Sequence, residues 1–322
     1  MSDSTHLLIP FAACSSSAAR EALRALSLPH LEKLLSRLTA TEADPGDDDS
    51  LSPPHERALA RAYGLEPLDG RIPWGAWQAR QTRPDDHGGA WAWITPCHWQ
   101  LATDHITLLH PQALQLDADD ARTLLAAMQP FFAQDGIELV FDAPTLWLAR
   151  APVFGDLRTA SLDRVIGRPI NPWLPQGDPG RTLRRLQSEM QMLLYTHPLN
   201  EARERGGLLP VNSFWVSGAG ALPTATAAAT PPATQASALR VTHYLRDAAL
   251  RADWPAWAEA WRQLDAGECA RLIEALDAGQ RVTLTLCGER SAQTFETLPR
   301  SLFRQISSKI ARQPAHNLLE PL

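Results

Sequence analysis

The chain is poor in lysine, in paired cysteines and in long apolar runs, and each shortage excludes a class of protein. Only Lys33 and Lys309 are lysines, and 30 basic residues are outnumbered by 36 acidic ones, which gives a formal net charge of -6. Because phosphate backbones attract basic surfaces, this balance argues against general nucleic-acid binding. No apolar run reaches the roughly 18 residues that a membrane-spanning helix needs, so no membrane partner is expected.

Four cysteines are scattered without a C-x-x-C pair, at Cys14, Cys97, Cys269 and Cys287. In a chain of 322 residues, this pattern predicts buried thiols in a reducing compartment rather than a disulfide framework or a zinc ribbon. Residues 7–14 are apolar, but no basic residue precedes them, so a secretory signal is not expected. We therefore expect a cytoplasmic protein.

Helical and strand-like patterns alternate along the chain. Apolar residues recur at helical spacing over 16–38, whereas between 72 and 110 they alternate with a period of two. Hydrophobic residues make up 44% and charged residues 20%, as in ordinary globular proteins. The mixture predicts an α/β (mixed α+β) fold, in which helices pack on a central mixed sheet.

Composition also suggests domain boundaries. A main α/β domain is expected over 1–217, with an exposed acidic loop at 41–54. Alanine, threonine, proline and glycine dominate 218–238, which predicts a flexible loop. The C-terminal α/β portion, 239–322, is expected to pack on the main domain and to contain a helix over 299–311.

One short pattern, H-P-x-N-x-x-R-x-x-G-x-x-P-x-N, carries most of the functional information. Its His197, Asn200 and Arg203 are spaced by three, so they fall on one helix face, and Asn212 follows before a strand that ends in G-x-G. An imidazole, amides and a guanidinium near a glycine-rich turn form a candidate phosphate or carboxylate site. The alternative is structural: Arg203 pairs with a nearby glutamate and the asparagines satisfy turn backbone.

This segment, over 197–220, resembles a signature of the archaeal-type cofactor-independent phosphoglycerate mutases. A longer part of the chain, including 154–157, 162–167 and 171–175 and the tryptophan-rich helix that follows, is similar to a bacterial regulatory-protein family. That family is typified by protein E of the regulation-of-pathogenicity-factors cluster. The first resemblance implies an alkaline-phosphatase-like fold, and the second implies regulation.

The mutase resemblance also implies a Ser or Thr nucleophile and two divalent metal ions held by Asp and His side chains. Where those enzymes place Asp-Gly after the first strand, residues 10–13 read Pro-Phe-Ala-Ala, and beyond Gly220 only His243 and His316 are histidines. The sequence therefore predicts no catalytic residue, no metal site and no cofactor, and it leans against an enzyme.

Eleven tryptophans form the second conspicuous feature. Trp254, Trp257 and Trp261 are spaced i, i+3, i+7, so they form one stripe along a helix. Such a stripe is most often part of a core, and the alternative is an interaction surface, because tryptophan is enriched at interface hot spots.

These observations predict a non-catalytic cytoplasmic regulatory protein with a phosphate- or carboxylate-binding pocket. The expected partners are a phosphorylated small molecule and a protein. A first alternative is a cofactor-independent phosphoglycerate mutase or a related metal-dependent phosphotransferase. A second is a protein-interaction module that uses the tryptophan stripe, with segment 197–220 purely structural.

Overall fold

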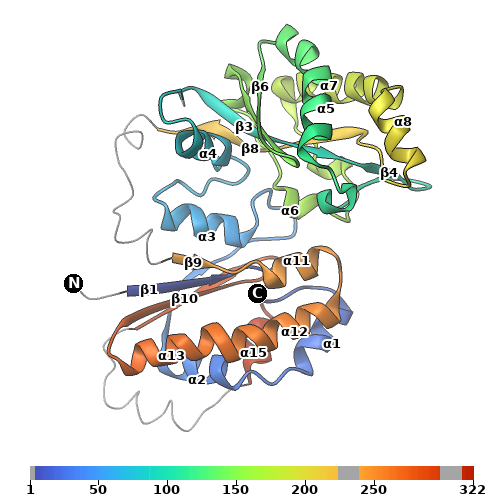
Figure 1. Ribbon diagram of the computed structural model, residues 1–322. Coiled ribbons are helices and arrows are strands. Elements are labelled where there is room, and N and C mark those ends of the chain that lie inside the picture. The colour runs from blue at the N-terminus through green and yellow to red at the C-terminus, as the bar shows by residue number, and fades with distance from the viewer. Residues whose placement is uncertain (1–3, 87, 224–238, 298–313) are drawn as a thin grey trace. The chain divides into compact units, whose positions relative to one another are not determined.

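The computed structural model describes residues 4–86, 88–223, 239–297 and 314–322, and the chain divides into two compact units (Figure 1). Unit 1 joins the two ends of the chain: it comprises Met1–Asp49, Pro53–Glu66 and Thr230–Leu322. Unit 2 is the central part, Ser50–Ser52 and Pro67–Ala229. Throughout the described ranges, the helices are too short or too polar to cross a membrane.

Unit 1 is built on a five-stranded mixed sheet in the order β2-β11-β10-β1-β9. Strand β1 runs parallel to both β10 and β9, whereas β11 pairs antiparallel with β10 and with β2. The strands are β1 (Ser4–Ile9), β2 (Thr39–Asp44), β9 (Leu239–Val241), β10 (Arg281–Cys287) and β11 (Ala292–Glu296). The predicted α/β fold with a mixed sheet and packed helices is therefore confirmed.

Helices cover one face of this sheet, and α3 lies over the other (Figure 1). The side chains alternate as a strand requires, so Leu7 and Ile9 of β1 and Leu284 of β10 enter the helix-covered core and are fully buried. The helices are α1 (Ser17–Arg24), α2 (Pro29–Arg37), α3 (Pro54–Ala62), α11 (Tyr244–Leu250), α12 (Trp254–Leu264), α13 (Ala270–Asp277) and α15 (Ala315–Leu319).

A single π-helical turn, Asp265–Cys269, joins α12 to α13 and anchors α2. The Asp265 carboxylate accepts hydrogen bonds from the backbone N–H groups of His30 and Leu31, and His30 Nδ1 lies 3.0 Å from it. Because α2 starts with Pro29 and has no side-chain cap of its own, this carboxylate satisfies its free N–H groups.

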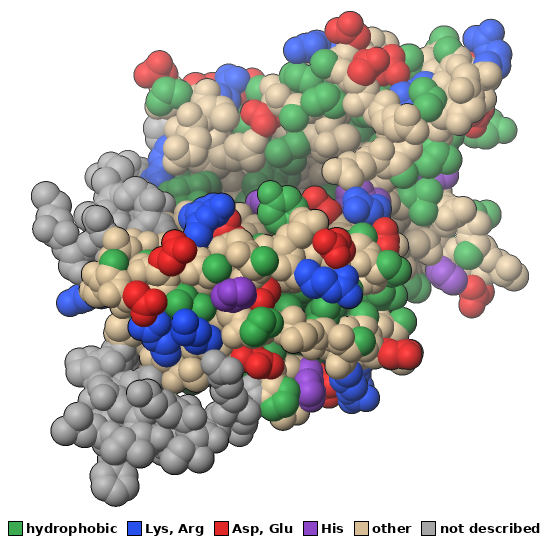
Figure 2. Space-filling view, turned by 60° about the horizontal axis from the view of Figure 1, so that its bottom comes forward, with side chains coloured by type: hydrophobic (Ala, Val, Ile, Leu, Met, Phe, Trp, Pro, Cys, Tyr) green, Lys and Arg blue, Asp and Glu red, His purple; other side chains and the backbone are tan. Residues whose placement is uncertain are grey.

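Charges of both signs are interspersed on the side of unit 1 that carries α12 and α13 (Figure 2). Several are paired, as Arg37 is with Asp277 at 2.7 Å and Arg271 with Glu268 at 2.8 Å. Exposed pairs of this kind contribute little to stability, and they give this surface no single sign of charge.

Unit 2 is built on an antiparallel four-stranded sheet in the order β6-β7-β3-β8. Helices α5 and α7 pack on one face, where Phe132 and Phe214 meet at 5.1 Å between ring centroids, and α4 packs on the other face. Strands β4 and β5 form a separate hairpin. The strands are β3 (Ala90–Cys97), β4 (Trp99–Leu101), β5 (Ile106–Leu108), β6 (Glu138–Ala143), β7 (Leu146–Arg150) and β8 (Ser213–Ala221). The helices are α4 (Trp74–Thr82), α5 (Ala118–Gln134), α6 (Leu162–Val165), α7 (Gly177–Tyr195) and α8 (Pro198–Arg205), with short 3₁₀ turns at Pro111–Leu114, Pro152–Phe154 and Asn171–Trp173.

The units divide the chain differently from the predicted main domain over 1–217 and C-terminal portion over 239–322. The reason is that β1, from the N-terminal end, lies between β9 and β10, so both ends of the chain share one sheet. Local composition carries no information about this pairing, because its partners are more than 230 residues apart.

Two loops that the sequence predicts have other bounds in the structure. The acidic stretch 41–54 begins inside the edge strand β2, in which Thr41 and Glu42 are exposed and Asp44 is buried. The loop expected at 218–238 begins later, because β8 continues to Ala221. Its remainder from 224 onward, like the whole helix expected over 299–311, lies outside the described residues.

Glycines allow α4 to approach the unit 2 sheet closely. A Cβ on Gly75 of α4 would lie 2.7 Å from the Ala92 Cα of β3. Gly218 of β8 has φ +60°, and a Cβ there would lie 2.9 Å from the Trp74 Cβ. The G-x-G at the end of segment 197–220 therefore meets the start of a helix.

We expect Gly218→Ala to lower the free energy of unfolding by about 3 kcal/mol, because the new methyl group collides with Trp74 and the positive φ disfavours alanine. Gly207→Ala is the matched control: its φ is +75°, but nothing lies within 4 Å of the added Cβ, so about 1 kcal/mol is expected. Urea unfolding measures both. Equal losses in the two variants would contradict the packing role of Gly218.

Candidate functional site

Segment 197–220 forms helix α8 and strand β8, as its pattern predicts. His197 is the N-cap residue of α8, and its Nδ1 accepts a hydrogen bond from the Leu199 N–H at 3.2 Å. Pro198 follows at the first helical position, where a missing N–H costs nothing. The imidazole therefore has a capping role in the structure.

The Asn200 side chain joins three backbone segments. It is 3% exposed, and its Nδ2 donates to the Leu194 carbonyl at 2.8 Å and the Val211 carbonyl at 2.7 Å. Its Oδ1 accepts from the Val211 N–H at 3.0 Å. Both amide hydrogens are thus used to hold the end of α7 against the approach to β8.

The Arg203 guanidinium is buried to the same degree and binds three different groups. Nε donates to the Leu209 carbonyl at 3.1 Å, Nη1 pairs with Asp120 Oδ2 at 2.8 Å, and Nη2 donates to the Leu114 carbonyl. Asp120 lies in the first turn of α5 and neutralises the charge of Arg203. An anion at this place would have to compete with that carboxylate.

Asn212 supports the edge of the β4–β5 hairpin. Its Oδ1 accepts from the Trp99 N–H at 2.7 Å, and its Nδ2 donates to the Trp99 carbonyl at 3.0 Å, as the backbone of a neighbouring strand would. The structure thus brings the sequence-predicted residues together around α8, where their polar groups bind the protein itself. Anion binding at this place stays a prediction.

The tryptophan stripe lies on α12, as expected. Trp257 and Trp261 are fully buried in the unit 1 core and meet edge to face, with ring centroids 6.3 Å apart. Trp254 is only partly buried against the same core. Two of the three rings therefore offer no surface to a partner in this structure.

The two metal ions that the mutase resemblance implies do not fit the residues that follow β1. Phe11, Ala12 and Ala13 are buried and apolar, and the Phe11 carbonyl accepts a hydrogen bond from Trp257 Nε1 at 2.9 Å. Across the described ranges, no group of three or more His, Cys, Asp or Glu side chains is placed to hold a metal ion. No metal-dependent step follows from these residues.

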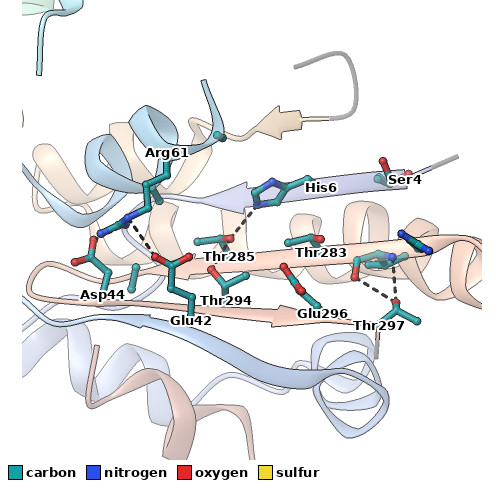
Figure 3. Close-up of a pocket in the computed structure, with 16 residues that line it drawn as sticks. Ser4, His6, Glu42, Asp44, Arg61, Thr283, Thr285, Thr294, Glu296 and Thr297 are labelled. Atoms are coloured by element: carbon teal, nitrogen blue, oxygen red, sulfur yellow. Dashed lines mark hydrogen bonds and ion pairs between the residues drawn. The ribbon is translucent and has the colours of Figure 1, made fainter. Parts of the chain in front are cut away.

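A cavity of about 970 Å³ opens on the polar face of the unit 1 sheet (Figure 3). It exists because α3 covers only part of this face, where Ala58 and Leu59 pack against Leu8, Cys287 and Ala292. Beyond α3, the same face carries polar groups from four strands. Its lining residues include the hydroxyl-bearing Ser4, Thr283, Thr285, Thr294 and Thr297.

A chain of hydrogen bonds crosses the floor of this cavity (Figure 3). His6 Nε2 lies 2.9 Å from Thr285 Oγ1, which in turn lies 3.1 Å from Thr294 Oγ1. Burial lowers the pKa of His6 to about 4, because the charged imidazolium loses its hydration. At neutral pH the imidazole is uncharged, so each of these three side chains can donate or accept a hydrogen bond.

Charged groups stand at the walls of the cavity. Arg61 of α3 pairs with Glu42 at 3.2 Å and with Asp44 at 2.9 Å, and Asp44 also accepts from Arg57 at 3.0 Å. Arg281 begins β10 opposite Ser4 and is exposed. The cavity therefore combines hydroxyls, a neutral imidazole, an internally paired cluster and a solvent-accessible guanidinium.

Sequence reasoning missed this cavity because its walls come from both ends of the chain. One signal was available: in the stretch V-T-L-T-L-C, threonines alternate with apolar residues at Thr283 and Thr285, which indicates a strand with one polar face. The partner strand with His6 could not be identified from that alternation.

We expect Arg203→Ala to lower the free energy of unfolding by about 3 kcal/mol, because two carbonyls and a carboxylate lose their donor. Asn200→Asp should also destabilise, since it places a carboxylate against the Leu194 and Val211 carbonyls. Arg205→Ala, on the exposed face of the same helix, is the control and should change stability by less than about 0.5 kcal/mol. Loss of phosphate binding without loss of stability would instead support the anion site.

The free energy of unfolding should depend on His6 between pH 6.5 and pH 4. The unfolded chain binds a proton at this imidazole near pH 6.5 and the folded chain only near pH 4, so acidification through this window favours unfolding. Relative to His6→Gln, the wild type should lose on the order of 3 kcal/mol between these limits. Urea unfolding at several pH values measures this difference, and a difference that does not vary with pH would contradict it.

Comparison with known proteins gives partial matches. No family model matches the chain. A 2,3-bisphosphoglycerate-independent phosphoglycerate mutase of Methanothrix thermoacetophila is 37% identical over 60 residues, which are 19% of this chain and 15% of that protein. The chain thus matches far less than two thirds of this curated relative.

Two solved structures resemble the chain at low identity. One is a cofactor-independent phosphoglycerate mutase from Thermoplasma acidophilum, with a TM-score of 0.38, 14% identity and coverage of 100% of this chain and 99% of the other. The other is the PH0037 protein from Pyrococcus horikoshii, with a TM-score of 0.47, 12% identity and coverage of 92% and 87%. At TM-scores below 0.5, these likenesses support no argument about function. The similarity to the curated mutase covers a single stretch of 60 residues.

Proposed function

We propose that this chain is a metal-independent binding protein with a regulatory role, and that it binds a small hydroxylated metabolite through an anionic group, a carboxylate or a phosphate. The observation that carries the proposal is the cavity of unit 1, in which a neutral His6 and two threonine hydroxyls form a continuous hydrogen-bond chain. Its volume of about 970 Å³ is at the upper end of the range for small-molecule sites.

The lining favours hydroxyl groups on the ligand. Thr285 is 2% exposed, and its hydroxyl lies between His6 and Thr294. The two hydroxyls can rotate their hydrogens, and the imidazole can change tautomer, to match a ligand. Glu296 lines the cavity near these groups and can accept a hydrogen bond from a ligand hydroxyl. A purely apolar ligand would leave these groups unsatisfied, at a cost of about 1–3 kcal/mol for each.

The anionic group of the ligand has a partner at one end of the cavity. Arg281 is exposed and supplies the planar donor fork that suits a carboxylate or a phosphate. Arg61 is less suitable, because Glu42 and Asp44 already neutralise it. This assignment keeps the predicted phosphate or carboxylate ligand but attributes it to unit 1 instead of to Arg203.

The regulatory role extends the sequence resemblance to a bacterial regulatory-protein family, and the apolar residues after β1 argue against a metal-dependent reaction. The apolar Phe11–Ala13 stretch lacks the carboxylate with which mutases of the resembling type bind metal. The match over 60 residues to a curated mutase favours the second candidate, a metal-dependent phosphoglycerate mutase or related phosphotransferase.

Isothermal titration calorimetry with 3-phosphoglycerate tests the proposal, because this probe carries a hydroxyl and two alternative anionic groups. We expect binding that weakens at least about tenfold in Thr285→Val and in Arg281→Gln, which remove a hydroxyl and the guanidinium. Thr123→Val, on an exposed turn of α5, is the matched control and should leave binding unchanged. Binding that survives both cavity variants would place the ligand elsewhere.

An enolase-coupled assay, with and without Mn²⁺, measures phosphoglycerate mutase activity and so distinguishes the proposed binding function from the second candidate. The proposed function predicts no conversion of 3-phosphoglycerate under either condition. Mn²⁺-dependent turnover would overturn it and establish an enzyme whose metal ligands differ from those of the resembling mutases.

A further inference from the structure

Unit 2 carries a groove that plays no part in the proposed metabolite site. It has a volume of about 700 Å³ and runs between the end of α7, helix α8 and the β4–β5 hairpin. Leu194, Ile106 and Pro210 contribute to its apolar floor and walls. We call this feature the α7–α8 groove.

Exposed apolar side chains gather at the α7–α8 groove. Leu101 and Tyr195 line it and are 80% and 86% exposed, and Met192, one turn before Tyr195 on α7, is 77% exposed. They are three of the five large apolar side chains that are most exposed in the described part of the chain. Single exposed apolar residues are ordinary, but a cluster beside a groove marks an interaction site.

The charge of the groove has one sign. Glu201 and Glu204 are spaced by three on α8, are exposed and line the groove. Lysine and arginine are missing from its lining. A segment that buried apolar side chains here would therefore gain from basic flanking residues and would be repelled if it were acidic.

The groove is also rigid, because the residues of segment 197–220 hold its walls. The Asn200 amide joins the end of α7 to Val211, just before β8, and the Asn212 amide joins the same segment to β4. His98 Nδ1 lies 2.8 Å from the Pro210 carbonyl and fixes a third side. A preformed groove loses little conformational entropy when a partner binds.

We propose that the α7–α8 groove docks a short segment of a partner protein in which apolar side chains alternate with arginine or lysine. The apolar side chains occupy the groove beside Leu101 and Tyr195, and the basic side chains pair with Glu201 and Glu204. This role is independent of the cavity in unit 1, so either proposal can fail without the other.

Fluorescence anisotropy with a labelled amphipathic peptide of leucine, alanine and arginine tests this proposal on the full chain. We expect binding that weakens at least about tenfold in the Glu201→Lys, Glu204→Lys double variant and in the Leu101→Ser, Tyr195→Ser double variant. Tyr244→Ser is the matched control, because Tyr244 is 66% exposed but lies on unit 1, and it should bind as the wild type does.

A second peptide, with glutamate in place of arginine, should bind at least about tenfold more weakly than the basic peptide. Equal binding of the two peptides, or basic-peptide binding that survives both double variants, would overturn the proposal. Sedimentation velocity tests whether a second copy of this chain occupies the groove instead. A wild-type dimer that dissociates in the Leu101→Ser, Tyr195→Ser variant would show that it does, and would also overturn the proposal.

Discussion

The parallel pairing of β1 with β10 and β9 is the interaction on which unit 1 depends. In the β1–β10 pair, Ser4 lies opposite Arg281 and Ile9 opposite Leu286, so a strand from one end of the chain lies between two strands from the other end. This register directs Leu7 into the helix-covered core and His6 toward Thr285 on the opposite face. A slip by one residue would exchange the two faces and place the imidazole among apolar side chains.

In unit 2 the corresponding constraint is the satisfaction of backbone groups by buried amide and guanidinium side chains. Asn200, Arg203 and Asn212 together bind carbonyl and N–H groups from α7, from the turn before α5, from the approach to β8 and from β4. A buried carbonyl without a donor is costly, so these bonds add to the apolar core that Leu114, Leu194 and Val211 of the same segments already share. The same donors would suit a phosphate, because backbone carbonyls and anions both demand N–H groups.

The two proposed sites have different chemistry, which suits different roles. The unit 1 cavity is lined by hydroxyls and a neutral imidazole, which suits a small hydroxylated molecule. The α7–α8 groove is apolar with an acidic rim, which suits a segment of another protein. A chain that binds a metabolite through one unit and a protein through the other has the two components that a regulator needs.

The sequence determined the local features of this protein. Thr283 and Thr285 alternate with apolar residues in β10, the Asp117 side chain caps α5 from within three residues, and Gly206 follows the last residue of α8. The mixed α/β fold class and the missing carboxylate after β1 also followed from the residues alone. These features depend on neighbours within a few positions, which propensity and periodicity describe directly.

Only the tertiary structure decided which groups meet. It placed β1 between β9 and β10, and this pairing forms the cavity that His6, Thr285 and Thr294 line. It also brought the Arg203 guanidinium within hydrogen-bond distance of two carbonyls and of Asp120. A sequence records that a donor is present but not which acceptor will reach it. That choice depends on contacts between residues far apart in the chain, whose geometry is set by the packing of the whole unit.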